Sequence, residues 1–259
     1  YCDSLTKLAA ANGHWNIIEF LLELNAKMKI FDFDQYVVCL DAVRNGHLLV
    51  ASKLFTTLYE SPERAWYNLW ELRRDGLAVA AAHGHCHILR ELLAYTFHKQ
   101  DQSVSNRSRA LIRASQAGQL EAVKILVENE ADMDYVDQDD GTPMMVAAED
   151  GHISIVNYLH QQGADYHQSW EIATSWGRAK VLKVFLEQGI ASQPDLNESL
   201  LSAAKEDDPV AVQVLLEAKA EVNTRDDQTS ETPLMRAAQN MNEYFALCSA
   251  EHLLKHGAA

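Results

Sequence analysis

The feature that most constrains this chain of 259 residues is a short pattern that recurs along its whole length. Two small residues, usually alanines, are followed after two variable positions by a glycine, as in Ala9-Ala10-Ala11-Asn12-Gly13. Eight copies begin at Ala9, Ala42, Ala80, Ala114, Ala147, Ala173, Ala203 and Ala237. Successive copies are 26 to 38 residues apart, and the glycine's place is taken by Asp207 in the seventh copy and by Met241 in the eighth. The chain is therefore predicted to be an irregular array of similar units.

Each copy is followed by a second set of apolar residues at helical spacing, such as Leu120, Val123 and Val127. The small pair suits a first helix that lies tightly between neighbours. The glycine supplies the positive φ with which a chain reverses into a second helix. The pattern predicts two short helices in each unit and an all-α fold.

Several stretches resemble the ankyrin repeat family, whose units read T-P-L-H-x-A-A-x-x-G-H and end in G-A-D-V-N. The best match is Thr142-Pro143-Met144-Met145-Val146-Ala147-Ala148-Glu149-Asp150-Gly151-His152, which continues to Gly163-Ala164-Asp165. Residues 220–238 and 130–134 give two further matches. The resemblance covers nearly the whole chain and implies an ankyrin-repeat α-solenoid of helix-turn-helix units with short or missing β-hairpin fingers.

We expect a single array of about eight units at approximately 4–36, 37–74, 75–108, 109–141, 142–167, 168–197, 198–231 and 232–259. The interval of 38 residues between Gly46 and Gly84 indicates an insertion at 56–74, which is predicted to be partly helical after Ser61-Pro62. The interval of 26 residues between Gly151 and Gly177 leaves no room for a β-hairpin finger between Asp165 and Trp170. The missing polar caps and the lack of an initiator methionine predict a piece of a longer protein.

Composition excludes several classes of function. Lysine and arginine number 22 against 37 acidic residues, a net charge of −15, which disfavours nucleic acid and membrane surfaces as partners. The four cysteines, Cys2, Cys39, Cys86 and Cys248, form no CxxC pair. Their spacing argues against a disulfide framework and predicts a reducing, cytoplasmic setting.

No common catalytic signature is present, so we expect no catalytic, cofactor-binding or metal-binding residues. The segment His83-Gly84-His85-Cys86-His87 has metal-ligating side chains. However, His85 occupies the family's Gly-His position, where the imidazole bonds the backbone of a neighbouring turn. The acidic run Asp137–Gly141 fails the register of a calcium loop, because Thr142 stands where that loop needs glycine.

The resemblance implies that fingers and the exposed side of the first helices form a concave groove that binds proteins. The residues predicted to contact a partner are Val136, Asp137, Gln138, Asp139, Asp140, Glu149, Trp176, Arg225, Asp227, Gln228, Glu231 and Gln239, with Trp66 and Trp70 as anchors. For Trp66 and Trp70, a packed cover over the second and third units is an equal alternative. Trp170 aligns with a buried leucine of the pattern and is expected in the core, whereas Trp176 is expected to be exposed.

The charge pattern further specifies the expected partner. Seven acids and no base occur between Glu128 and Asp140, which favours a basic partner segment, although such acids can also serve solubility alone.

The leading hypothesis is a monomeric protein-interaction module without catalysis or cofactor. The alternative is the targeting module of a larger enzyme or of a secreted bacterial effector, because the irregular units resemble arrays of such effectors. The target would then be in the host cytosol.

Overall fold

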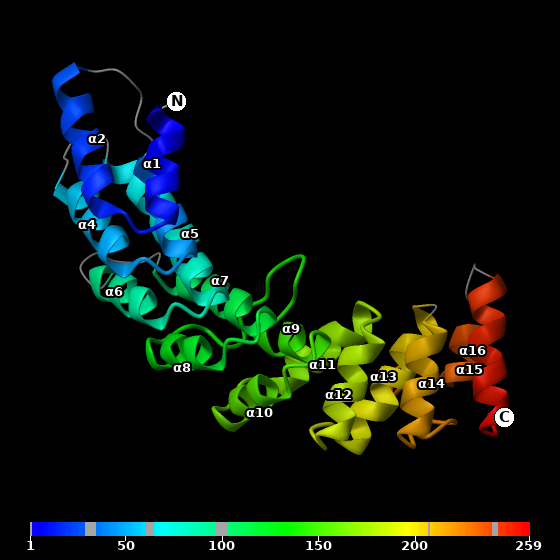
Figure 1. The fold of residues 1–259 in the computed structure, drawn as a ribbon. Helices are drawn as coiled ribbons and strands as arrows, with labels where there is room; N and C mark the ends of the chain where they lie inside the picture. Colours follow the sequence, from blue (N-terminus) through cyan, green and yellow to red (C-terminus); the bar gives the residue numbers. More distant parts are fainter. Residues whose placement is uncertain (1, 29–34, 61–64, 97–102, 207, 240–242) are drawn as a thin grey trace. The chain divides into compact units, whose positions relative to one another are not determined.

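The computed structural model describes residues 2–28, 35–60, 65–96, 103–206, 208–239 and 243–259 (Figure 1). The chain divides into an N-terminal half, Tyr1–Tyr135, and a C-terminal half, Val136–Ala259. Every helix within these described ranges is an α-helix, and no strand occurs in them. The predicted all-α fold with short or missing fingers is confirmed.

The N-terminal half contains four pairs of helices, in which each odd-numbered helix packs on the even-numbered helix that follows it. The helices are α1 (Cys2–Ala11), α2 (Trp15–Met28), α3 (Gln35–Arg44), α4 (Leu48–Glu60), α5 (Ala65–Ala82), α6 (Cys86–Thr96), α7 (Ser103–Gln116) and α8 (Leu120–Glu128). The first helices α1, α3, α5 and α7 lie side by side in chain order, and α4, α6 and α8 pack in the same order beside them (Figure 1).

The C-terminal half repeats this arrangement. Its helices are α9 (Pro143–Glu149), α10 (Ile153–Gln161), α11 (Tyr166–Ser175), α12 (Ala179–Glu187), α13 (Gln193–Lys205), α14 (Pro209–Glu217), α15 (Pro233–Ala237) and α16 (Glu243–Lys255). The helices α9, α11, α13 and α15 again follow one another, and α12, α14 and α16 form the second row (Figure 1). Within each half, the helix pairs thus bury their apolar faces against one another.

The small residues of the repeated pattern lie at the contacts between first helices. Ala10, Ala42, Ala80, Ala114, Ala147, Ala173 and Ala203 are all completely buried. The turn after each of the first seven pairs is closed by the same backbone hydrogen bond, for example from His85 N to Ala80 O at 2.9 Å. The predicted core positions and helix reversals are therefore present in both halves.

The residues expected as an insertion lengthen two existing helices. Helix α4 ends at Glu60 and α5 begins at Ala65, and α5 spans 18 residues where α9 and α15 span 7 and 5. Residues 61–64, with the expected start at Ser61-Pro62, lie outside the described ranges. The extra sequence therefore extends the second unit's last helix and the third unit's first helix.

In the described part of the chain the fifth and eighth units have a finger, whereas the sixth unit does not. Asp137 and Gly141 form an isolated antiparallel bridge before α9. In the sixth unit Asp165 directly caps α11 by accepting a hydrogen bond from Gln168 N at 3.2 Å. The missing finger predicted between Asp165 and Trp170 is thus explained by a helix that begins at once. Asp207, which replaces a glycine in the seventh unit, lies outside the described residues.

Candidate protein-binding surface

The finger of the fifth unit is a tight loop held by its own backbone. Asp137 and Gly141 exchange two hydrogen bonds of 3.0 Å, and the Asp137 carboxylate accepts a third from Asp139 N at 3.2 Å. Gln138 and Asp139 are exposed at the tip, whereas Val136, Asp137 and Asp140 are half-buried. Of the five residues predicted in this finger, the tip pair is therefore the most accessible.

Helix α9 fixes the base of this finger. Thr142 is the N-cap residue, and its Oγ1 accepts a hydrogen bond from Met145 N at 3.2 Å. The same hydroxyl lies 2.7 Å from Ser169 Oγ on α11. Because both side chains are buried, this polar link ties the finger to the next helix pair.

The turn between α11 and α12 brings an aromatic ring to the finger. Trp176 follows α11 directly and has 38% of its surface exposed. A Cβ atom added to Gly141 would lie 3.3 Å from Trp176 Cζ3, so the ring stands beside the end of the finger. Asp139 and Trp176, predicted from separate repeats, therefore belong to one continuous surface.

Arg178 is a member of this surface that the sequence interpretation missed. Its guanidinium forms an ion pair with Glu149, donates to the Asp139 carbonyl at 3.4 Å, and lies 5.6 Å from the centroid of the Trp176 ring. Lys180 also donates to the Glu149 carbonyl. The Glu149 carboxylate is thus already neutralised within the chain, and a basic partner would have to share it with Arg178.

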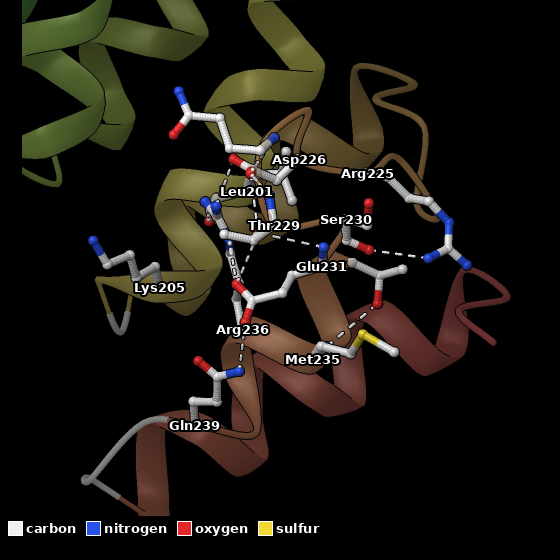
Figure 2. A network of polar contacts seen from close by, with 12 residues as sticks. Leu201, Lys205, Arg225, Asp226, Thr229, Ser230, Glu231, Met235, Arg236 and Gln239 are labelled. Atoms are coloured by element: carbon white, nitrogen blue, oxygen red, sulfur yellow. Dashed lines mark hydrogen bonds and ion pairs between the residues drawn. The ribbon is translucent and has the colours of Figure 1, made fainter.

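The finger of the eighth unit is organised around Asp226 (Figure 2). Its carboxylate accepts hydrogen bonds from Gln228 N at 2.9 Å, Thr229 N at 2.6 Å and Thr229 Oγ1 at 3.0 Å. It also forms an ion pair with Arg236, with an N–O distance of 2.7 Å. The hydrogen bonds from Thr229 lower the pKa of Asp226, with further contributions from Gln228 N and the Arg236 charge. This carboxylate is a structural centre of the finger.

The predicted residues of the eighth unit surround this centre. Glu231 accepts from Gln239 at 2.8 Å and pairs with Arg236 at 3.5 Å, and these contacts lower the pKa of Glu231, the bond from Gln239 first (Figure 2). Arg225 donates to Ser230 O at 3.0 Å. Asp227 and Gln228 are exposed at the tip. The tip pair is therefore accessible, while Glu231 and Gln239 already serve the internal network.

Sequence reasoning missed Asp226 and Arg236, although a signal was available. Arg236, with 15% of its side chain exposed, also donates to Leu201 O at 3.4 Å and so connects α15 with α13. In residues 226–236 it is the one cation among three acids. A lone cation on a short, closely packed helix indicates an internal ion pair more than a contact residue.

The remaining predicted anchors cannot be placed as side chains. Trp66 and Trp70 belong to α5, but their side chains lie outside the described part of the chain. The two expectations for them, packed cover and binding wedge, stay predictions. Trp170, by contrast, is 2% exposed, and its predicted place in the core is confirmed.

The histidine cluster is engaged with backbone. His85 Nε2 lies 2.9 Å from Arg44 O and His83 Nδ1 lies 2.9 Å from Val79 O. The predicted bond from His85 to a neighbouring turn is confirmed. In the described ranges no group of three histidine, cysteine or acidic side chains is arranged to hold a metal ion. The helices in those ranges also include none that is long and apolar enough to cross a membrane.

Three comparisons with known proteins found similarity to ankyrin repeat proteins. A family model for ankyrin repeats, described as three copies, matches residues 77–169. The "Ankyrin repeat and KH domain-containing protein mask-1" of Caenorhabditis elegans is 28% identical over 275 residues, which cover 99% of this chain and 10% of that protein. The crystal structure of the human ASB11 ankyrin repeat domain is 18% identical, with a TM-score of 0.47 and 98% of each chain covered.

Residues 77–169 thus match ankyrin repeats, as the sequence pattern predicted, and the relative with ankyrin repeats aligns with nearly the whole chain. Ankyrin repeats are generally non-catalytic modules for protein interaction. The chain spans about a tenth of the length of its nematode relative.

Proposed function

We propose that this chain binds a partner protein through a surface made of the fifth finger, the end of α9 and the turn between α11 and α12. The residues of this surface, called here the acidic finger surface, are Gln138, Asp139, Glu149, Trp176 and Arg178. The observation that carries the proposal is the exposed Trp176 ring beside an exposed acidic tip. Neither is needed by the repeat core, and aromatic anchors next to charged groups dominate protein interfaces.

The charge of the C-terminal half supports a basic partner segment. Residues 136–259 contain 8 lysines and arginines against 20 acidic residues, whereas residues 1–135 contain 14 against 17. The C-terminal half therefore carries most of the net negative charge. Such a field accelerates association with a basic segment and makes binding sensitive to salt.

A binding experiment with a matched control tests this proposal. Affinity capture from a lysate is compared for the wild-type chain, the double variant Asp139→Lys/Trp176→Ala, and the control Glu187→Lys, which changes an exposed acid at the end of α12. The captured protein is then titrated in purified form at two salt concentrations. Loss of binding in the double variant alone supports the acidic finger surface, and equal binding by all three contradicts it.

A second candidate function is that of a targeting module within a larger enzyme or a secreted bacterial effector, for which the acidic finger surface would select the substrate. The cytoplasmic setting, the monomeric state and the role in a bacterial effector remain predictions. Sedimentation of the purified chain tests the monomeric state.

A further inference from the structure

Arg178 stands at a position that histidine occupies in other units. It directly follows a turn glycine, as His47 and His85 do. In those units the imidazole Nε2 lies 2.9 Å from a backbone oxygen of the preceding unit, which is Ala11 O for His47 and Arg44 O for His85. Each acceptor is two residues before the turn glycine of that preceding unit. In these units the side chain after the glycine therefore links two neighbouring turns.

In the sixth unit a different side chain makes this link. The equivalent acceptor is the backbone oxygen of Glu149, two residues before Gly151, and it accepts a hydrogen bond from Lys180 Nζ. Lys180 lies on α12, two residues after Arg178. Because Lys180 links the two turns, the guanidinium of Arg178 is not needed to hold the repeats together.

The Arg178 guanidinium instead lies among three groups from three different parts of the fifth and sixth units. It forms an ion pair with the Glu149 carboxylate, donates to Asp139 O at 3.4 Å, and lies 5.6 Å from the centroid of the Trp176 ring. A carboxylate, a carbonyl oxygen and an indole face together bind a guanidinium through charge, hydrogen bonds and stacking. The three groups therefore form a site with the chemistry that arginine requires.

The fold holds these groups in place without Arg178. The backbone bonds between Asp137 and Gly141 close the finger and place the Asp139 carbonyl at its tip. A Cβ atom added to Gly141 would lie 3.3 Å from Trp176 Cζ3, so the ring is packed against the end of the finger. The Arg178 side chain, in contrast, is 30% exposed and reaches the site from the N-cap of α12. The site is thus open to another guanidinium when Arg178 turns toward solvent.

We propose that Glu149, Asp139 O and Trp176 form a binding site for an arginine of the partner, and that Arg178 fills this site in the free chain. This inference rests on the function proposed above and names the side chain that the partner contributes. An exposed ion pair and an exposed cation–π contact are each weak, so the partner's arginine can displace Arg178. As an internal competitor, Arg178 lowers the apparent affinity about three- to tenfold.

The site favours arginine over lysine. A planar guanidinium stacks on the indole ring while its N–H groups reach both a carboxylate and a carbonyl oxygen, whereas an ammonium group is a compact point charge. The negative charge of the C-terminal half attracts a basic segment of either kind. The contacts within the site then select the side chain.

Fluorescence anisotropy with the purified chain tests this proposal. The probe is a short labelled peptide in which arginine alternates with serine, and the two reference peptides carry lysine or glutamine in place of arginine. The test variant is Arg178→Gln. The control Lys183→Gln makes the same change in net charge at an exposed residue of α12. Thermal melts verify that both variants are folded, and Arg178→Met takes the place of Arg178→Gln if that variant unfolds.

The wild-type chain is expected to bind the arginine peptide in preference to the glutamine peptide. Arg178→Gln should tighten binding of the arginine peptide about three- to tenfold, and Lys183→Gln less than about twofold. The gain from Arg178→Gln should be larger for the arginine peptide than for the lysine peptide. It should disappear when Trp176→Ala is added, because the stacking surface is then lost.

Four results would overturn the proposal. The first is an equal gain in affinity from Arg178→Gln and Lys183→Gln, which indicates a response to net charge alone. The second is weaker binding by Arg178→Gln than by wild type, which would make Arg178 itself a contact to the partner. The third is an equal gain for the arginine and lysine peptides, and the fourth is no binding of the arginine peptide by Arg178→Gln. The lysate capture described above decides the proposed function separately from these results.

Discussion

The imidazole ring of His85 lies against the backbone of Gly46, one repeat earlier in the chain. A Cβ atom added to Gly46 would be 2.8 Å from His85 Cε1, and Gly46 has a φ of 77°. The ring is held there because its Nε2 lies 2.9 Å from Arg44 O. His47 lies against Gly13 in the same way, and a Cβ atom added to Gly13 would be 2.7 Å from His47 Nδ1. Glycine is therefore required at these turns both for its conformation and for the space it leaves.

Replacing Gly46 with alanine is expected to destabilise the N-terminal half. The left-handed conformation costs about 1 to 2 kcal/mol for a residue with a Cβ atom. The overlap with the His85 ring adds about 1 to 3 kcal/mol. Urea denaturation of the Gly46→Ala variant measures the sum as a lower transition midpoint.

Two controls separate the steric contribution from the conformational one. Gly189 has a φ of 67° but no heavy atom within 4 Å of an added Cβ atom, so Gly189→Ala should show the conformational cost alone. In a double-mutant cycle, Gly46→Ala should cost less in a His85→Ala background. Equal costs in both backgrounds would show that the ring does not restrict this position.

The two tryptophans of the sixth unit should respond differently to truncation. Trp170 is 2% exposed, stacks on Phe185 with ring centroids 6.4 Å apart, and donates to Ser199 Oγ. Trp170→Ala is expected to cost about 3 to 5 kcal/mol of unfolding free energy. Trp176→Ala is expected to cost less, about 1 to 2 kcal/mol, because 38% of its surface is already exposed in the folded chain. Chemical denaturation of both variants checks this, and similar costs would contradict the assigned positions.

Features set by local sterics could be predicted from the sequence, whereas specific long-range pairs could not. The buried alanines, the turn glycines and the bond from His85 to a neighbouring turn all follow from positions within one repeat. The ion pair of Arg178 with Glu149 spans 29 residues and depends on how far one side chain reaches across the next helix pair. No repeat position requires it, so the pattern contained no sign of it.

The segment expected at 56–74 shows a second limit. It is predicted to be partly helical, and helix α5 includes residues from Ala65 onward. The repeat pattern has no counterpart for these residues, so it could not predict that they continue into the first helix of the third unit.

The hydroxyl group of Thr142 is expected to contribute more than that of Thr232. Both are N-cap residues, but Thr142 accepts from Met145 N at 3.2 Å and also contacts Ser169 Oγ at 2.7 Å. Thr232 accepts from Met235 N at 3.4 Å. Thr142→Val should cost about 1 to 2 kcal/mol for the cap and about 1 kcal/mol more for the buried hydrogen bond. Denaturant midpoints of Thr142→Val and Thr232→Val check this, and equal losses would show that the Ser169 contact adds nothing.

The carboxylate of Asp226 should make the stability of the eighth unit depend on pH in a defined direction. Its hydrogen bonds from Thr229, with those from Gln228 and the ion pair with Arg236, lower its pKa in the folded chain. A lowered folded pKa means that the unfolded chain binds a proton more readily. The stabilisation is therefore complete above the pKa of an unfolded aspartate, about 3.9, and is lost as the pH falls through the lower folded value.

Asp226→Asn keeps an oxygen acceptor for Thr229 but removes the charge that pairs with Arg236 (Figure 2). The melting temperature of this variant should be lower than that of wild type at neutral pH, and the difference should shrink as the pH falls below about 4. Asp227→Asn changes an exposed acid at the tip of the same finger and should leave the melting temperature near the wild-type value at every pH. A difference for Asp226→Asn that persists unchanged into strong acid would show that the network depends on the shape of the side chain, with no contribution from its charge.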